Sequence, residues 1–236
     1  DRGLTDFLYG GDQRFRLCQE TILGIGGVMM LGALGYGDIQ VFHMNEGHSA
    51  LATLALLEEL CGERSERRLS ETELQKVRQR CAFTTHTPVP AGHDRFPADL
   101  VYQVLGEKRA GVLAQLQLLN GALNMTELAL RFSGFVNAVS MRHAEVSRAM
   151  FPDHGICAIT NGVHATTWTT APLATLYDRH LPGWRGDNGY LRYAIGISRA
   201  EIRQAHELAK QELLRQVRWL TGSQLDEKVF TIGFAR

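Results

Sequence analysis

At the centre of the chain's organisation stands the sequence Phe83-Thr84-Thr85-His86-Thr87-Pro88-Val89-Pro90-Ala91-Gly92-His93-Asp94-Arg95-Phe96-Pro97. The short apolar run that leads into it, Cys81 to Phe83, is typical of a buried strand. Three prolines and a glycine then exclude regular structure, so we predict a stiff loop at a strand end. Because proline fixes φ in advance, such a loop loses little entropy when it closes on a ligand. The loop is therefore either a binding site or an ordinary surface loop whose charges pair with each other.

The composition is that of a globular protein without excess charge. The chain has 236 residues, 44% of them apolar, enough for one large domain or two small ones. Lys plus Arg and Asp plus Glu number 25 each, so charge gives no reason to expect nucleic acid or a membrane as partner. No apolar run is long enough to span a bilayer, and the first residues resemble no signal peptide. The cysteines are scattered without a Cys-x-x-Cys pair, so we expect reduced thiols and a cytoplasmic location.

Residues 13–34 are predicted to form a buried helix, because apolar side chains cover most of its circumference. Gly24, Gly26 and Gly27 lie inside it. No strand precedes these glycines and the third is misplaced for a dinucleotide-binding loop. We therefore attribute them to close helix packing.

A second polar segment, Met44-Asn45-Glu46-Gly47-His48, lies between a predicted strand at residues 39–43 and a predicted helix at residues 49–60. Open α/β sheets bind ligands at such junctions, because free N–H groups and the helix dipole point out of them. His43, Glu46 and His48 raise the alternative of a metal site. Their spacing matches neither His-Glu-x-x-His nor His-x-x-Glu-His, which argues against that alternative.

The predicted elements repeat as strand, helix, helix, strand, which implies parallel strands and an α/β fold. The second helix of this repeat begins at a capping box, Ser70 to Glu73, and runs to about Gln79. Farther along, we predict helices at 96–105, 111–119, 124–132, 140–150, 171–179 and 198–220, and strands at 135–139 and 228–234.

A third informative segment is Ile159-Thr160-Asn161-Gly162-Val163-His164. Asn-Gly is a strong turn signal and predicts a hairpin. The flanking segments are too short or too polar for a convincing pair of strands. The turn could instead present the Asn161 amide, which carries donors and an acceptor, to a polar ligand. The sequence leaves both alternatives open.

Three motifs together resemble the α-glucan phosphorylases, the glycogen and maltodextrin phosphorylase family, and most of all its shorter bacterial branch. They are Phe42 to His48, Thr84 to Pro97 and Ile159 to His164, in the order and approximate spacing of the family. Further support comes from Leu8-Tyr9-Gly10-Gly11-Asp12, Arg16-Leu17-x-Gln19-Glu20 and Phe230-Thr231-Ile232-Gly233-Phe234-Ala235-Arg236. The resemblance spans nearly the whole chain, and the combination is highly specific.

The resemblance implies a retaining glycosyltransferase of the two-domain GT-B type, with Rossmann-like parallel-sheet domains of which this chain is an incomplete part. Such an enzyme transfers the terminal glucosyl unit of an α-1,4-glucan to orthophosphate and yields glucose 1-phosphate. In this family the substrate phosphate and the phosphate of pyridoxal 5'-phosphate do the acid–base work. The protein then holds sugar and phosphate in register and stabilises the charge developing on the sugar ring.

The resemblance also implies roles for single residues. His86 is similar to the catalytic-site histidine whose ring bonds the glucosyl 6-hydroxyl, and Asn161 to an asparagine that contacts the same sugar. The other residues implied to bind substrate are Asp12 of a gate loop, Asn45, Glu46 and His48 on the acceptor side, and Val136 and Asn137 beside the sugar. Arg236 falls at the start of the run that cradles phosphate.

By the same resemblance, the chain is an internal fragment. In the family, the lysine that binds the cofactor lies beyond Arg236, and further strands precede Asp1. We therefore expect residues 1–222 to be the carboxyl part of the first, glucan-binding domain, and residues 228–236 to be the first strand of the second, cofactor domain. The fragment alone should neither bind the cofactor nor turn over. Its partners would be α-1,4-glucan, orthophosphate and the remainder of the parent polypeptide, and a homo-oligomer stays open.

Two alternatives remain at this point. The first is a non-catalytic module that binds glucan, since half of an active site could retain sugar affinity. The second is a metallohydrolase that would use His43, Glu46, His48, His86 and His93.

Overall fold

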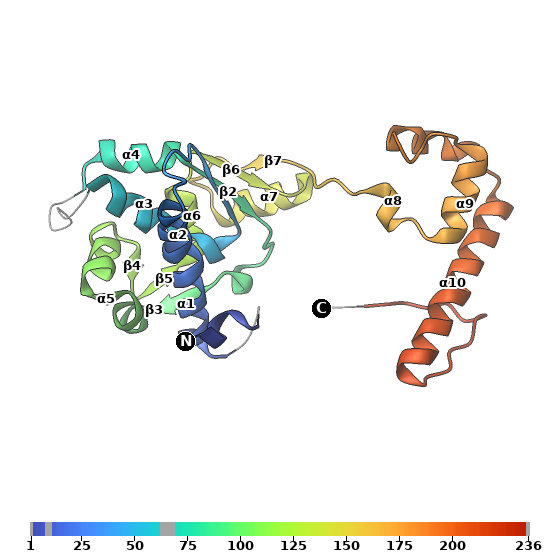
Figure 1. Cartoon of the computed structure of the whole chain (residues 1–236), viewed down its shortest axis with the longest axis horizontal. Helices are drawn as coiled ribbons and strands as arrows, with labels where there is room; N and C mark the ends of the chain where they lie inside the picture. Colours follow the sequence, from blue (N-terminus) through green and yellow to red (C-terminus); the bar gives the residue numbers. More distant parts are fainter. Residues whose placement is uncertain (1, 8–10, 62–68, 235–236) are drawn as a thin grey trace. The chain divides into compact units, whose positions relative to one another are not determined.

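The chain forms two compact units, Asp1–Asn161 and Gly162–Arg236. A computed structural model describes residues 2–7, 11–61 and 69–234 (Figure 1). Each unit has its own cluster of buried apolar side chains, one drawn from residues 17–156 and the other from residues 174–205. This division does not test the expected end of the first domain at residue 222, so that assignment stays a prediction.

The first unit is built on a parallel sheet, as predicted. Its strands are β1 (Phe42–Asn45), β2 (Cys81–Thr85), β6 (Phe135–Ala138) and β7 (Cys157–Ala158), in the order β1-β2-β6-β7. Every neighbouring pair runs parallel. The α/β class is therefore confirmed, and the sheet is consistent with a Rossmann-like domain. Strand β1 begins three residues later than the sequence pattern indicated, and β7 pairs although its segment had looked too short.

The predicted helix at 13–34 is confirmed, but only one of its faces is buried. It consists of α1 (Gln13–Thr21), a π-helical turn η2 (Ile22–Gly26) and α2 (Gly27–Ala33). Among its apolar residues, Leu17, Ile25 and Val28 are buried, whereas Ile22, Leu23, Met29 and Met30 are among those exposed. A Cβ on Gly24 would lie 2.7 Å from the backbone nitrogen of Ala52, so close packing explains this glycine. Nothing lies within 4 Å of such a Cβ on Gly27, so packing does not explain that one.

The helices that connect the strands begin close to their predicted starts. The 3-10 turn η3 (Gly47–Ser49) leads into α3 (Ala52–Cys61), and α4 (Glu71–Gln79) starts at the complete capping box of Ser70 and Glu73. Asn124 and Ser140 cap α6 (Met125–Arg131) and α7 (Met141–Met150) through their side-chain oxygens. The Ser140 cap fixes where the chain leaves the carboxyl end of β6.

A small antiparallel sheet, which the sequence did not indicate, anchors the proline-rich loop. It contains β3 (Arg95–Pro97), β5 (Ala122–Asn124) and β4 (Leu119–Asn120), in the order β3-β5-β4. Strands of two or three residues show no periodicity that a sequence pattern could reveal. The two helices predicted at 96–105 and 111–119 are present as two helical segments within α5 (Ala98–Gln115), separated by a kink at Gly106, whose φ is 78°. Short 3-10 turns complete the unit at η1 (Arg2–Thr5) and η4 (Pro90–Gly92).

The second unit contains α8 (Ala165–Trp168), α9 (Ala171–His180), the 3-10 segment η5 (Asn188–Gly196) and α10 (Arg199–Thr221). Helices α9 and α10 pack together beside the buried Trp184. The predicted strand at 228–234 is absent from the described residues, since a strand forms only beside a second strand that pairs with it, and no described strand pairs with this segment. Residues 159–164 likewise form no hairpin. No helix in the described ranges is both long and apolar enough to cross a bilayer.

Candidate functional site

Polar side chains form a row across the sheet where β1, β2 and β6 end. The strand register places Asn45 beside Thr84 and Thr84 beside Asn137. The Thr84 hydroxyl donates to Oδ1 of Asn137 over 2.8 Å, and Asn137 is buried. Nε2 of His43 lies 2.7 Å from the same hydroxyl oxygen. Because that hydroxyl already gives its proton to Asn137, Nε2 of His43 must be the donor.

His86 follows β2 directly, and two residues at the end of β1 hold it. Its ring atom Nε2 lies 2.6 Å from Oδ1 of Asn45. Its backbone N–H donates to Oε2 of Glu46 over 2.7 Å, and the Thr87 hydroxyl donates to the same oxygen over 2.9 Å. His86 itself remains exposed. The predicted stiff loop therefore starts with a histidine that is open to solvent and fixed at both backbone and ring.

Glu46 makes these contacts from a strained backbone. Its φ of 71° and ψ of 169° lie in a region that is essentially reserved for glycine. Such a conformation costs about 1–3 kcal/mol and persists only where the surroundings enforce it. Here its own N–H donates to the Thr84 carbonyl over 2.9 Å, and its Oε1 accepts from Gly47 over 3.2 Å. No sequence pattern indicated this strain.

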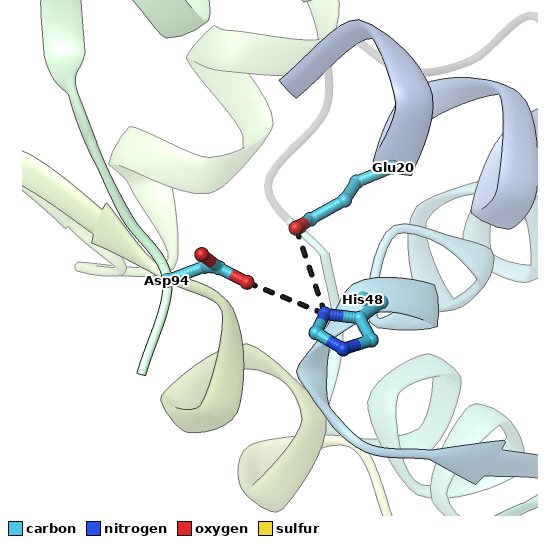
Figure 2. Close-up of side chains that lie close together, drawn as sticks. All are labelled: Glu20, His48 and Asp94. Carbon is cyan, nitrogen blue, oxygen red and sulfur yellow. Dashed lines mark ion pairs between the residues drawn. The ribbon is translucent and has the colours of Figure 1, made fainter. Parts of the chain in front are cut away.

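A second group of side chains, the ion cluster, consists of Arg16, Glu20, His48 and Asp94. Figure 2 shows three of them converging from helix α1, turn η3 and the loop before β3. Nδ1 of His48 lies 3.3 Å from Oδ2 of Asp94 and 3.7 Å from Oε1 of Glu20. Arg16 pairs with Glu20 over 2.9 Å and with Asp94 over 3.2 Å. The cluster thus ties three segments that lie far apart in the sequence.

The ion cluster shifts the protonation of its members. Burial raises the pKa of Glu20 to about 7, and its Oε2 has no hydrogen-bond partner in the described part of the chain. Hydrogen bonds first to Asp94 and then to Glu20 raise the pKa of His48 to about 9. Burial would raise the pKa of Asp94, but the bonds from His48 and its neighbours outweigh burial and hold that pKa well below its usual range. Nη2 of Arg16 lies 2.7 Å from His48, so the carboxylates must offset the repulsion between two cations.

An open pocket of about 530 Å³ borders the ion cluster. Its polar lining includes Asp12, Arg16 and Asp94, and Phe96 supplies an apolar wall. Asp12 caps α1 by accepting from the Phe15 N–H over 2.8 Å. His93 also lines the pocket. Its Nδ1 lies 2.8 Å from the Thr126 hydroxyl, and burial lowers its pKa.

The structure brings most of the predicted substrate-binding residues to this edge of the sheet. Asn45, Glu46 and His86 contact each other directly. The backbone N–H of Asn161 donates to the Val139 carbonyl, just beyond the end of β6, and its side chain is exposed. Val136 differs, because it is buried in the core with 5% of its surface exposed. Arg236 lies outside the described residues.

The metal-site alternative loses its predicted ligands. Within residues 2–7, 11–61 and 69–234, one group of three side chains lies close enough to share an ion: Glu20, His48 and Asp94. The predicted set of His43, Glu46, His48, His86 and His93 forms no such group there. Arg16 contacts all three members of the observed group, which places a cation among them already.

Arg16, Glu20 and Asp94 were not among the predicted site residues. One signal was available for Glu20, which lies three residues after Leu17 and four before Gly24, on the buried face of the helix. A carboxylate in that position needs a partner. Arg16, one turn earlier, was the obvious candidate. Asp94 could not be found in this way, because it joins the cluster through the tertiary fold.

Searches for family models give no match to this chain. Curated proteins do match it over all of its residues. It is 35% identical to "Glycogen phosphorylase" of Mycobacterium tuberculosis, of which it covers 32%, and 35% identical to "Maltodextrin phosphorylase" of Thermococcus litoralis, of which it covers 31%. Identity to "Glycogen phosphorylase" of Aquifex aeolicus is 29%, with 39% of that protein covered. The resemblance to the α-glucan phosphorylases is thus confirmed: this chain is homologous throughout to a segment of glycogen and maltodextrin phosphorylases that makes up about a third of their length.

Proposed function

We propose that the chain forms the glucan-facing part of an α-glucan phosphorylase of the GT-B type. The observation that carries the proposal is the fixed, exposed His86 at the carboxyl edge of a parallel sheet, with Asn161 attached to the same edge. Ligands of open α/β sheets bind at this edge. The names of the relatives add the substrate class, glycogen and maltodextrin.

The chemistry of the edge suits a neutral sugar. A sugar hydroxyl both donates and accepts, so a site for it needs mixed donors and acceptors held in place. His86 and the Asn161 amide offer both, and the charges of the ion cluster are compensated internally. In this reading, the edge orients the glucosyl unit, and the reacting phosphate comes from solution.

In our proposal, Asn45, Glu46 and His48 lie on the acceptor side of this position, and Asp12 belongs to a gate loop beside it. Asp12 lines the pocket beside the ion cluster, and His48 belongs to that cluster. Asn137 is buried and accepts a hydrogen bond from Thr84, so in our proposal it holds the row of polar side chains in place. The buried Val136 would act through packing of the strand rather than by touching sugar.

Pyridoxal 5'-phosphate, which would supply a phosphate for proton transfer, has no fitting attachment point here. The chain has four lysines, and a Schiff base requires one of them at the site. Lys76 and Lys108 lie on the exposed faces of α4 and α5, and Lys210 and Lys228 belong to the second unit. None of the four bonds to the edge residues in the described part of the chain. We therefore assign no step to the cofactor, and the cytoplasmic location and any homo-oligomer stay predictions.

The test of this proposal is an assay for glucose 1-phosphate from maltoheptaose and orthophosphate. It should use the longest polypeptide in which this sequence occurs, with His86→Ala as the variant and His206→Ala, exposed on α10, as the control. We expect activity in the parent, a loss of activity of roughly two orders of magnitude in His86→Ala, and full activity in the control. Binding of maltoheptaose without any phosphorolysis would instead favour the non-catalytic glucan-binding module.

A further inference from the structure

Oδ1 of Asn45 and both carboxylate oxygens of Glu46 bond to the protein itself. Oε2 of Glu46 accepts from the His86 N–H and the Thr87 hydroxyl, and its Oε1 accepts from Gly47. Oδ1 of Asn45 lies 2.6 Å from Nε2 of His86. Both side chains converge on one histidine, His86.

The contact with Asn45 decides which ring nitrogen of His86 carries the proton. An amide oxygen can only accept, so Nε2 must be the donor. In the neutral ring Nδ1 is then an acceptor, and Nδ1 has no hydrogen-bond partner among the residues that the structure describes. Asn45 thus selects the tautomer in which Nδ1 remains available.

The strained backbone of Glu46 is consistent with a role in holding His86. A glycine would adopt φ 71° and ψ 169° without strain, yet the chain has a glutamate there. Its carboxylate reaches across from β1 to the residue that follows β2, and a charged acceptor forms the stronger kind of hydrogen bond. Strain that persists beside a site is typical of residues that organise it.

We propose that Asn45 and Glu46 are positioning residues: Asn45 holds His86 as the Nε2–H tautomer, and Glu46 fixes its backbone. The inference rests on the proposed function for the role of His86, but its geometric content can be tested without any sugar. It differs from the roles on the acceptor side that the family resemblance implies for these two residues.

Two spectroscopic measurements on the 236-residue chain test the geometry. Long-range ¹H–¹⁵N spectra of histidine-labelled protein identify the tautomer, with the His86 signals assigned by their loss in His86→Gln. We expect the Nε2–H form in the wild type and in Asn45→Asp, which keeps the acceptor, and a mixture of tautomers in Asn45→Leu. A wild-type ring protonated at Nδ1 alone would overturn the role of Asn45.

Amide hydrogen exchange tests Glu46. Glu46→Gly relieves the strain and removes the carboxylate, so the first unit should keep or gain thermal stability while the His86 amide exchanges roughly tenfold faster or more. Glu46→Gln keeps the shape and one acceptor and should lie between the two. Unchanged exchange of the His86 amide in Glu46→Gly would overturn the clamp.

Calorimetry with maltoheptaose then separates this inference from the proposed function. If the wild type binds, Asn45→Leu and Glu46→Gly should each weaken binding, while Asn45→Asp should bind as the wild type does. If the wild type does not bind but the spectra show the expected tautomer and clamp, the proposed function fails and the positioning roles stand. Tight binding by both Asn45→Leu and Glu46→Gly would contradict the inference.

Discussion

Nε of Arg16 lies 2.9 Å from Oε1 of Glu20, one helical turn away, and the Glu20 side chain is 1% exposed. This ion pair is the most buried part of the ion cluster, and His48 and Asp94 contact it from two other segments. Burying charges is costly unless they are compensated, so the cluster should hold helix α1 in place beside the pocket. Its protonation should then govern the stability of the first unit.

We expect the first unit to lose stability as the pH rises from 6.5 through about 9, because His48 binds its proton more tightly when folded. The contribution of His48 is complete below pH 6.5 and gone above about 9. His48→Gln should remove this pH dependence, which amounts to a total loss on the order of 2 kcal/mol in the free energy of unfolding. Urea unfolding should be followed by circular dichroism or amide exchange, because all three tryptophans lie in the second unit. Equal slopes for both proteins in this pH range would contradict the prediction.

Glu20 should dominate a lower pH range. Its folded pKa of about 7 exceeds the unfolded value of 4.5, so the folded state binds the proton more tightly. The free energy of unfolding should therefore fall as the pH rises from 4.5 to about 7. Glu20→Gln stays neutral and should abolish this fall, gaining on the order of 2 kcal/mol relative to the wild type by pH 8. Glu145→Gln, at an exposed position of α7, is the matched control. If Glu20→Gln tracked the wild type at every pH, the buried-acid account would be wrong.

Gly24→Ala should destabilise the first unit, because the new Cβ would lie 2.7 Å from the Ala52 nitrogen and 2.9 Å from the Leu51 backbone. Backbone atoms cannot move aside as a side chain can, so we expect a loss of about 1–3 kcal/mol. Gly27→Ala is the control in the same helix, since its Cβ meets nothing within 4 Å. Replacing that glycine should stabilise by about 0.5–1 kcal/mol. Losses of similar size in both variants would show that packing against α3 is not the cause.

Thr84→Val should cost about 1–3 kcal/mol, because it leaves the buried Oδ1 of Asn137 and the ring of His43 without their shared partner. Thr84→Ser keeps the hydroxyl and loses one methyl group, so it should cost about 1 kcal/mol. The free energies of unfolding from urea titrations compare the two. A serine variant less stable than the valine variant would indicate that the methyl group, not the hydrogen-bond row, matters here.

Much of the fold was predictable because local chemistry fixes it. Ser70, Asn124 and Ser198 mark helix starts through caps that operate within one turn. The apolar run before His86 and the prolines after it placed a strand end at the correct residue to within two positions. Parallel strands followed from the alternation of strands and helices.

What the sequence could not show depends on contacts between distant segments. Asp94 meets Glu20 and His48 through the tertiary fold, and Glu46 is strained because its carboxylate reaches a neighbouring strand. A last strand was expected at 228–234 from β propensity, but propensity alone cannot supply a pairing partner. For the same reason, the sequence left two interpretations of Asn161 open, a hairpin turn and a contact with a ligand. The structure excludes the hairpin.

The central claim is that an α-glucan binds at the carboxyl edge around His86. Titration of ¹⁵N-labelled chain with maltoheptaose tests it directly, with backbone and histidine signals followed by NMR. The account predicts perturbations that centre on His86, Asn45 and Asn161 and vanish in His86→Ala. No perturbation at millimolar sugar, or changes confined to residues 162–234, would contradict it.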